Sequence, residues 1–217
     1  MTKTISTTFD LNEVQLSSKV NVQRYREMEA AKDRDGLSNF IEERLLERYV
    51  DPLQTSTKKH GFLMMAAACL LIETLESFYR GWPDTNGQIR REDIEDPCKP
   101  AGAGRTRVSR GEVAFCYFFQ RESTFSPFRP HAHEFYANVR CGILHQGEST
   151  HGWRIRRKGD LFDAPNLIIN ACEFLEVVEH AIGRYRKKLR APKVDWDCEM
   201  WKNFRAKMDA IIEHCKP

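Results

Sequence analysis

The sequence has no paired-cysteine motif and no long apolar run, and each absence excludes a class of protein. Its seven cysteines are scattered without a CxxC pair, which excludes a zinc ribbon and a dithiol redox motif. The most apolar run, 61–72, is about half of the roughly 20 residues that a membrane-spanning helix needs. Residues 1–10 lack the apolar segment of a signal peptide. We therefore expect a soluble, cytoplasmic protein with reduced cysteines.

The chain also lacks a strong excess of charge, an internal repeat and a low-complexity tract. Its formal net charge is +3, with 30% charged and 41% hydrophobic residues, as in ordinary soluble proteins. Such a balance does not by itself indicate a nucleic-acid partner, because the local distribution of charge matters more. A chain of 217 residues is long enough for one sizeable domain with a real core.

Apolar residues recur at helical spacing along most of the chain, so we expect an all-α bundle of five or six helices. The helix at 58–82 is apolar nearly all round at its start, which is typical of a buried central helix; Thr57 is its expected cap and Gly81 its end. The segment 111–123 is expected to be helical, although its periodicity also allows a strand. The expected helices are 37–53, 58–82, 111–123, 126–148, 163–189 and 196–215.

Three regions lie outside this pattern or at its edges. Residues 1–34 are expected to form an N-terminal arm, 35–192 the helical domain, and 193–217 a C-terminal helix packed on the same domain. Within the domain, 83–110 is rich in Gly, Pro and Asp and reads as a long loop insertion with one short helical turn. The Gly-bounded segment 151–162 is expected to be a small hairpin or an irregular loop. Asp163 is expected to cap the helix that follows.

Arg140 and His145 are the leading candidates for catalytic residues. A histidine can take or give a proton at neutral pH, and an arginine offers forked donors to phosphate oxygens. RNA carries its own nucleophile, the 2′-hydroxyl, so such a pair suits metal-free RNA cleavage. On a regular helix, five residues turn the direction by about 140°, so the pair does not share one face. Convergence requires a loosened helix at Gly142, a reaching arginine or a second copy of the chain. The alternative is a surface ion pair and a helix-end histidine.

The segment FYANVRCGILHQGE at 135–148, after a long apolar helix that ends in ETLESFYRG at 73–81, resembles the HEPN superfamily. The hallmark of that superfamily is an arginine, four to six residues and a histidine, and the resemblance covers roughly residues 37–190. It implies a metal-independent ribonuclease that acts as a homodimer, with both motifs in one cleft. The implied setting is prokaryotic antiviral defence or toxin–antitoxin control, with an antitoxin or a nucleotidyltransferase as candidate partner.

By position, the resemblance makes His145 the general acid/base and Arg140 the group that stabilises the phosphate. Glu73 or Glu76 could orient the arginine, although either could equally be an ordinary solvated carboxylate. Catalytic members often carry a polar residue after the arginine, where this chain has Cys141. The alternative is therefore a non-catalytic HEPN module that binds nucleic acid, nucleotide or a partner protein.

Basic residues just after the motif are candidates for an RNA track, with an aromatic ring for base stacking. These RNA-binding candidates are Trp153, Arg154, Arg156, Arg157 and Lys158. A second basic stretch lies at 184–190, and both could instead be solvated faces or helix ends. No cofactor or metal is expected, because His131 and His133 diverge on a helix and no acid or cysteine partner stands at ligand spacing.

Overall fold

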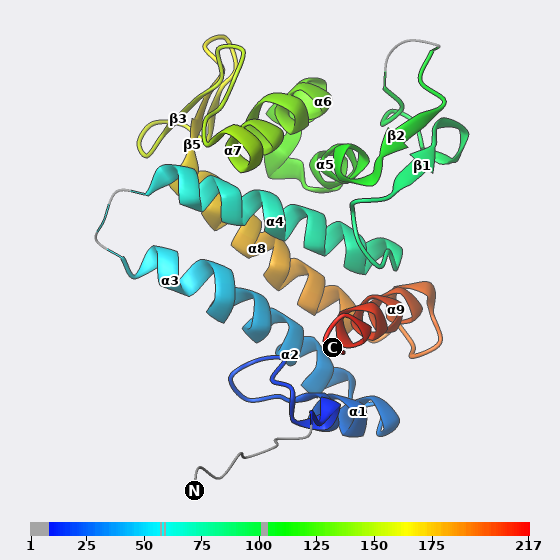
Figure 1. Ribbon diagram of the computed structural model, residues 1–217. Coiled ribbons are helices and arrows are strands. Elements are labelled where there is room, and N and C mark those ends of the chain that lie inside the picture. Colours follow the sequence, from blue (N-terminus) through cyan, green and yellow to red (C-terminus); the bar gives the residue numbers. More distant parts are fainter. Residues whose placement is uncertain (1–8, 57, 59, 101–103) are drawn as a thin grey trace, which may run out of the picture.

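The computed structural model describes residues 9–56, 58, 60–100 and 104–217, and these are mostly helical (Figure 1). The expected helical character is confirmed, but two small sheets accompany the helices. The α-helices are α1 (Val22–Ala30), α2 (Arg34–Leu45), α3 (Asp51–Gln54), α4 (Gly61–Arg80), α5 (Arg110–Arg121), α6 (Ala132–Phe135), α7 (Cys141–Gln146), α8 (Ala171–Leu189) and α9 (Glu199–Glu213). The strands are β1 (Gln88–Arg90), β2 (Arg107–Ser109), β3 (Arg154–Arg156), β4 (Phe162–Asp163) and β5 (Ile168–Asn170).

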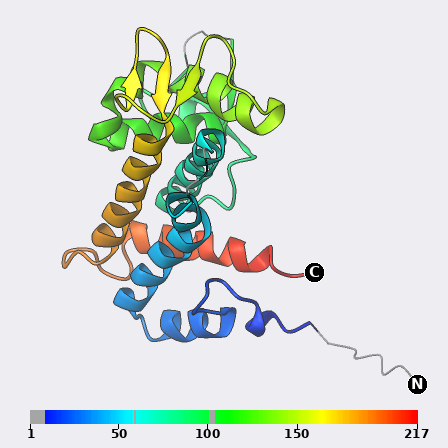
Figure 2. The same ribbon diagram turned by 90° about the vertical axis from the view of Figure 1, so that its left-hand side faces the viewer.

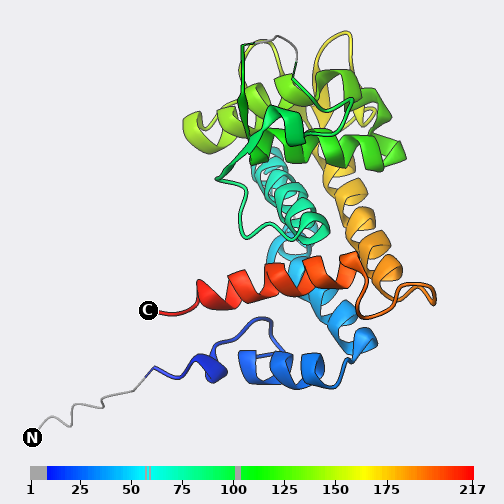
Figure 3. The ribbon, with the colours of Figure 1, turned by 90° about the vertical axis from the view of Figure 1, so that its right-hand side faces the viewer.

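The core is organised around α4 and α8, which lie side by side (Figures 2 and 3). α4 buries side chains on most of its circumference, and it ends at Gly81 in the left-handed conformation, as predicted. By length and composition α4 could span a membrane, but 61% of its most apolar window is buried inside the protein. It is therefore the central core helix, longer than the 61–72 run suggests. The predicted cap Thr57 lies outside the described residues.

α5 and α7 pack against α4, and an aromatic cluster comes from α5, α6 and the segment between them. The segment that also allowed a strand is the helix α5, because α4 and α6 bury it on nearly all sides. Phe119 is packed edge-on to Phe135, with ring centroids 5.3 Å apart. The helix expected at 126–148 is broken into pieces. Ser123–His131 is a 3-10 helix, since Pro127 and Pro130 cannot donate α-helical hydrogen bonds, and α6 begins only at Ala132.

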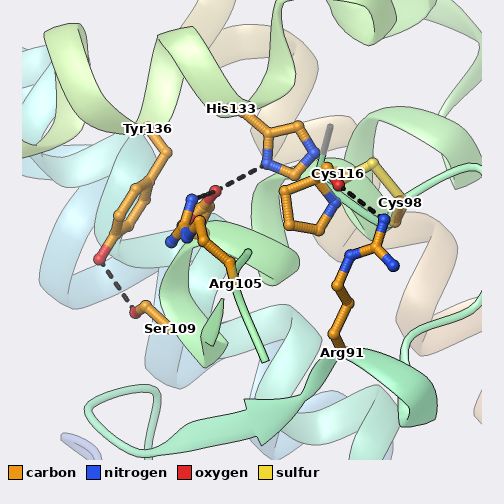
Figure 4. Close-up of polar contacts among 9 residues, drawn as sticks. Arg91, Cys98, Arg105, Ser109, Cys116, His133 and Tyr136 are labelled. Atoms are coloured by element: carbon orange, nitrogen blue, oxygen red, sulfur yellow. Dashed lines mark hydrogen bonds and ion pairs between the residues drawn. A yellow bond between two sulfur atoms is a disulfide. The ribbon is translucent and has the colours of Figure 1, made fainter. Parts of the chain in front are cut away.

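The insertion 83–110 is more structured than the expected loop. β1 and β2 pair antiparallel, with Ile89 opposite Val108. A disulfide joins Cys98 in the insertion to Cys116 in α5, with Cα atoms 5.5 Å apart (Figure 4). The expectation that all cysteines are reduced is wrong for this pair. The sequence hides the arrangement because it depends on contacts between segments that are distant along the chain.

A second sheet follows α7, in the strand order β3-β5-β4. β3 pairs parallel with β5 rather than with β4, so of the two structures expected for 151–162, a small hairpin or an irregular loop, the hairpin is wrong. Asp163 does not cap a helix either. Its carboxylate accepts hydrogen bonds from Asn166 in a turn, and Asn170 caps α8 by accepting from the backbone of Cys172. The predicted helix therefore starts eight residues later, at Ala171.

The N-terminal segment is part of the packed protein from Leu11 onward, and the term arm does not describe it. α1 is capped by Asn21, whose side chain accepts from the backbone of Arg24. Val22 and Tyr25 on α1 are fully buried. Residues 1–8 of the predicted arm lie outside the described residues. At the other terminus, α9 lies within the predicted C-terminal helix and crosses the lower half of the molecule (Figure 3).

Candidate functional site

Arg140 and His145 meet within a single chain. A π-helical turn, Tyr136–Arg140, joins α6 to α7, and His145 lies in the last turn of α7. The Arg140 Nη1 atom lies 3.5 Å from His145 Nε2. The helix is loosened before Arg140 rather than at Gly142, and the long arginine side chain bridges the remaining angle. Convergence therefore does not require a second chain.

Glu73 on α4 holds the arginine in place. Arg140 Nε donates to Glu73 Oε1 at 2.6 Å and Nη2 donates to Oε2 at 3.3 Å, which is a forked, charge-assisted pair. Glu73 is only 8% exposed, and Thr85 in the insertion donates a further hydrogen bond to it. Burial opposes the charge of Arg140, but the hydrogen bonds and charge of Glu73 outweigh it and raise the pKa of the guanidinium. Arg140 is thus fixed as a cation.

Tyr136 supports the same guanidinium from the helix side. The centre of its ring lies 5.4 Å from the Arg140 Cζ atom, within cation–π range. Its hydroxyl lies 3.2 Å from Ser109 Oγ at the end of β2 (Figure 4). Burial raises the pKa of Tyr136, so the ring stays neutral. The insertion therefore contacts both supports of Arg140, through Thr85 and through Ser109.

Of the two carboxylates proposed to orient the arginine, only Glu73 does so. Glu76 is fully buried and pairs with Arg121 instead. The Arg121 guanidinium also lies 3.7 Å from the ring centre of Tyr79. Burial raises the pKa of Glu76, while Arg121 opposes the rise. Glu76 is a structural residue of the core.

Cys141 and Gly142 begin α7 beside the pair. Cys141 is half-buried, and its neighbour Cys69 on α4 is fully buried, which raises the pKa of the Cys69 thiol. A side chain at Gly142 would meet the carbonyl oxygen of Glu148 at 2.5 Å. The glycine is needed because the chain folds back against α7 immediately after His145. This return leaves His145 itself exposed.

A cleft of about 250 Å³ opens beside Arg140. Two leucines line it and stay partly exposed, Leu70 of α4 at 39% and Leu144 of α7 at 47%. Its polar lining comes from α4, from the turn before β1, from the π-helical turn and from α9: Glu73, Thr74, Ser77, Asp84, Thr85, Asn86, Arg140 and Lys207.

The basic candidates after the motif divide into two groups. Trp153 is 3% exposed and stacks on Phe162 with centroids 5.5 Å apart, so the prediction that it stacks on a base is wrong. Its ring completes the aromatic core. Arg154, Arg156 and Lys158 are exposed on and after β3, whereas Arg157 is half-buried against Gly61. In the second basic stretch, ion pairs with carboxylates occupy Arg184, Arg186 and Arg190.

The histidines before the motif have carboxylate partners. His133 Nδ1 lies 2.9 Å from Glu112, which Arg105 also contacts (Figure 4). His131 Nδ1 lies 3.5 Å from Glu134. Within the described part of the chain, no three His, Cys, Asp or Glu side chains gather in a way that could hold a metal ion.

Sequence reasoning missed Thr85, Ser109 and Lys207, which reach the site only through tertiary packing. Tyr136 could have been found, because it stands one helical turn before Arg140. No protein-family model, no curated protein and no solved structure matches this chain. The HEPN resemblance accordingly remains an expectation drawn from the motif.

Proposed function

We propose that the chain is a HEPN-type, metal-independent endoribonuclease with Arg140 and His145 as its catalytic residues. The observation that carries the proposal is the clamp on the arginine. The Glu73 carboxylate accepts hydrogen bonds from Nε and Nη2 of Arg140. Nη1 is left directed toward the exposed His145. A fixed cation next to a titratable imidazole is the arrangement that phosphate transesterification needs.

The chemistry follows from the two side chains. An imidazole nitrogen of His145 removes the proton of the RNA 2′-hydroxyl, and the 2′-oxygen attacks the adjacent phosphorus. The bond from phosphorus to the 5′-oxygen breaks, and that oxygen takes a proton from an acid. The products carry a 2′,3′-cyclic phosphate and a 5′-hydroxyl. Arg140 binds the non-bridging oxygens, whose negative charge grows in the transition state.

A homodimer fits this chemistry, because the reaction needs both a base and an acid while each chain brings one histidine to the site. Phe62 and Leu63, at the start of α4, are 36% and 57% exposed. Leu63 lies on the same face of α4 as Leu70, two helical turns away. A second copy that covers these apolar side chains would bring two Arg140–His145 pairs to one interface. Exposed Arg154 and Arg156 on β3 are available for the RNA backbone.

The proposed setting is prokaryotic defence or toxin–antitoxin control, with an antitoxin or a nucleotidyltransferase as partner and a cytoplasmic location. The setting and the partners come from the HEPN resemblance. The Cys98–Cys116 disulfide is unusual for a reducing compartment, where such bonds mostly serve redox sensing or catalysis.

Cleavage of RNA in the presence of EDTA tests the proposal. The wild-type protein is expected to cut RNA and to leave cyclic phosphate ends, whereas His145→Ala and Arg140→Ala are expected to lose cleavage by at least about 100-fold. Circular dichroism shows whether each variant is folded. Activity that EDTA abolishes, or that His145→Ala retains, would overturn the assignment.

The second candidate is a binding module without catalysis, and Cys141 favours it, since a cysteine stands where catalytic HEPN proteins often have a polar residue. That module would bind RNA, nucleotide or a partner protein with unchanged affinity in His145→Ala. Tight binding by wild type without any cleavage would support it over the enzyme.

A further inference from the structure

The cleft beside Arg140 has a lining that the cleavage chemistry does not use. We propose that it is a nucleobase subsite, which binds the base of a nucleotide next to the scissile phosphate and reads that base with Asn86. The proposal rests on the ribonuclease function and names the part of the substrate that this chain recognises.

The size and walls of the cleft suit one base. Its volume of about 250 Å³ lies below the range of roughly 300–1,000 Å³ that is usual for drug-sized ligands. Leu70 and Leu144 present partly exposed apolar side chains from two different helices. Enzymes that handle an unstacked base commonly hold it between apolar or aromatic side chains. The leucines therefore provide an apolar contact for the faces of the ring.

The turn before β1 supplies the polar edge. Asp84 Oδ1 accepts from the backbone of Asn86 at 2.8 Å and of Gly87 at 3.2 Å, and Gly111 donates from its backbone to the Thr85 carbonyl at 3.1 Å. These bonds fix the turn. The Asn86 side chain is exposed and, among the described residues, makes no hydrogen bond of its own. A carboxamide presents a donor and an acceptor side by side, which matches the edge of a base.

Two cations line the same cleft. Arg140 lies beside His145, and Lys207 comes from α9. Lys207 Nζ donates to the Pro83 carbonyl at 2.8 Å, which places the ammonium beside the turn that carries Asn86. A nucleotide that puts its base against Asn86 and Leu70 thus has a cation for the scissile phosphate and a second for the next one. The cleft also brings the C-terminal helix into substrate binding.

Chimeric oligonucleotides test the subsite with the full-length protein. Each is a DNA strand that contains a single ribonucleotide, so cleavage can occur only after that position. One series varies the base of the ribonucleotide among A, C, G and U, and a second series varies the base that follows it. Wild type is expected to prefer one base in one series by about 10- to 100-fold in kcat/KM, the discrimination of a well-formed bidentate contact.

The variant Asn86→Ala is expected to reduce that preference to about threefold or less while it still cleaves. Gln88→Ala is the matched control, because Gln88 is an exposed amide on β1 just outside the cleft lining, and it should keep the full preference. Equal cleavage of all bases by wild type, or an unchanged preference in Asn86→Ala, overturns the subsite alone. A wild type that cuts no oligonucleotide and no RNA overturns the ribonuclease function and the subsite together.

Discussion

The variant Glu73→Gln tests whether the buried carboxylate positions Arg140 for the proposed cleavage. Glutamine keeps the shape of the side chain but removes its charge, and its NH2 group faces a guanidinium that can only donate. Arg140 loses one arm of the forked pair, and the Thr85 hydroxyl loses or shares its acceptor. The arginine is then free to leave the position that puts Nη1 beside His145.

The expected loss of stability follows from how buried the pair is. The side chains of Arg140 and Glu73 are 16% and 10% exposed, so solvent screens the pair only weakly. Removing one partner of a buried ion pair costs about 3–5 kcal/mol, and we expect the lower end, about 3 kcal/mol, because Arg140 borders an open cleft. The rate of RNA cleavage should fall by about 100-fold, the effect of misplacing a catalytic group by roughly 1 Å.

Urea unfolding measures the first quantity, and cleavage of RNA per folded molecule measures the second. Glu76→Gln is the matched control, since Glu76 is also a buried carboxylate on α4 with an arginine partner but lies outside the cleft lining. It should lower the free energy of unfolding and leave the cleavage rate of the folded protein unchanged. A Glu73→Gln protein that cleaves at the wild-type rate, or two variants with equal losses of activity, would refute the positioning role.

Two further predictions concern the attachment of the insertion. Reducing the Cys98–Cys116 disulfide, which closes a separation of 18 residues, should lower the free energy of unfolding by about 3 kcal/mol, and equal urea midpoints with and without reductant would contradict this. Burial would raise the pKa of Glu112, but hydrogen bonds from His133 and Arg105 outweigh it and lower the pKa. Glu112 therefore binds fewer protons in the native state than in the unfolded state between the depressed pKa and about pH 4.3, and stability falls as the pH drops through this window. Glu112→Gln should flatten this fall in urea titrations from about pH 3 to 7, and an unchanged slope would exclude Glu112 as its source.

The longest helices can be predicted from the sequence because their apolar periodicity is strong. α4 and α9 agree with the prediction, and the C-terminal part of α8 does as well. The prediction wrongly includes residues 163–170 in α8, since the apolar run Leu167–Ile169 suits a buried strand as well as a helix. Leu167 also adopts a positive φ of 52°, which a helix cannot contain.

The sheets and the disulfide could not be predicted from the sequence, because they join short segments that are distant along the chain. β1 and β2 are three residues each, and the whole segment 91–106 separates them along the chain. Strands this short have no periodicity of their own, and their pairing is set by packing on α5. The same holds for Cys98 and Cys116, whose pairing depends on where the insertion returns to the helix.

Some residues of the candidate site can also be predicted from local sequence, whereas others reach it only through tertiary packing. Arg140 and His145 follow from a local motif, and Glu73 could be proposed because it belongs to the helix that the motif packs against. Thr85 and Ser109 belong to the insertion, whose course no local pattern shows. The prediction for Trp153 is wrong because a tryptophan beside arginines suits a stacking surface, while the aromatic core that buries it is assembled from distant segments.

The insertion and the Arg140–His145 pair are parts of one structure. Thr85 contacts Glu73 on one side of Arg140, and Ser109 contacts Tyr136 on the other. Thr85 precedes β1 and Ser109 ends β2. The Cys98–Cys116 disulfide and the ion pair between Arg105 and Glu112 also connect this insertion to α5. If the insertion moved away from α5, Glu73 and Tyr136, which both contact Arg140, would lose their hydrogen bonds to Thr85 and Ser109 together. On an ideal helix the five-residue spacing would keep Arg140 and His145 on different faces. Their side chains meet because α4 and the insertion together fix the position of the guanidinium.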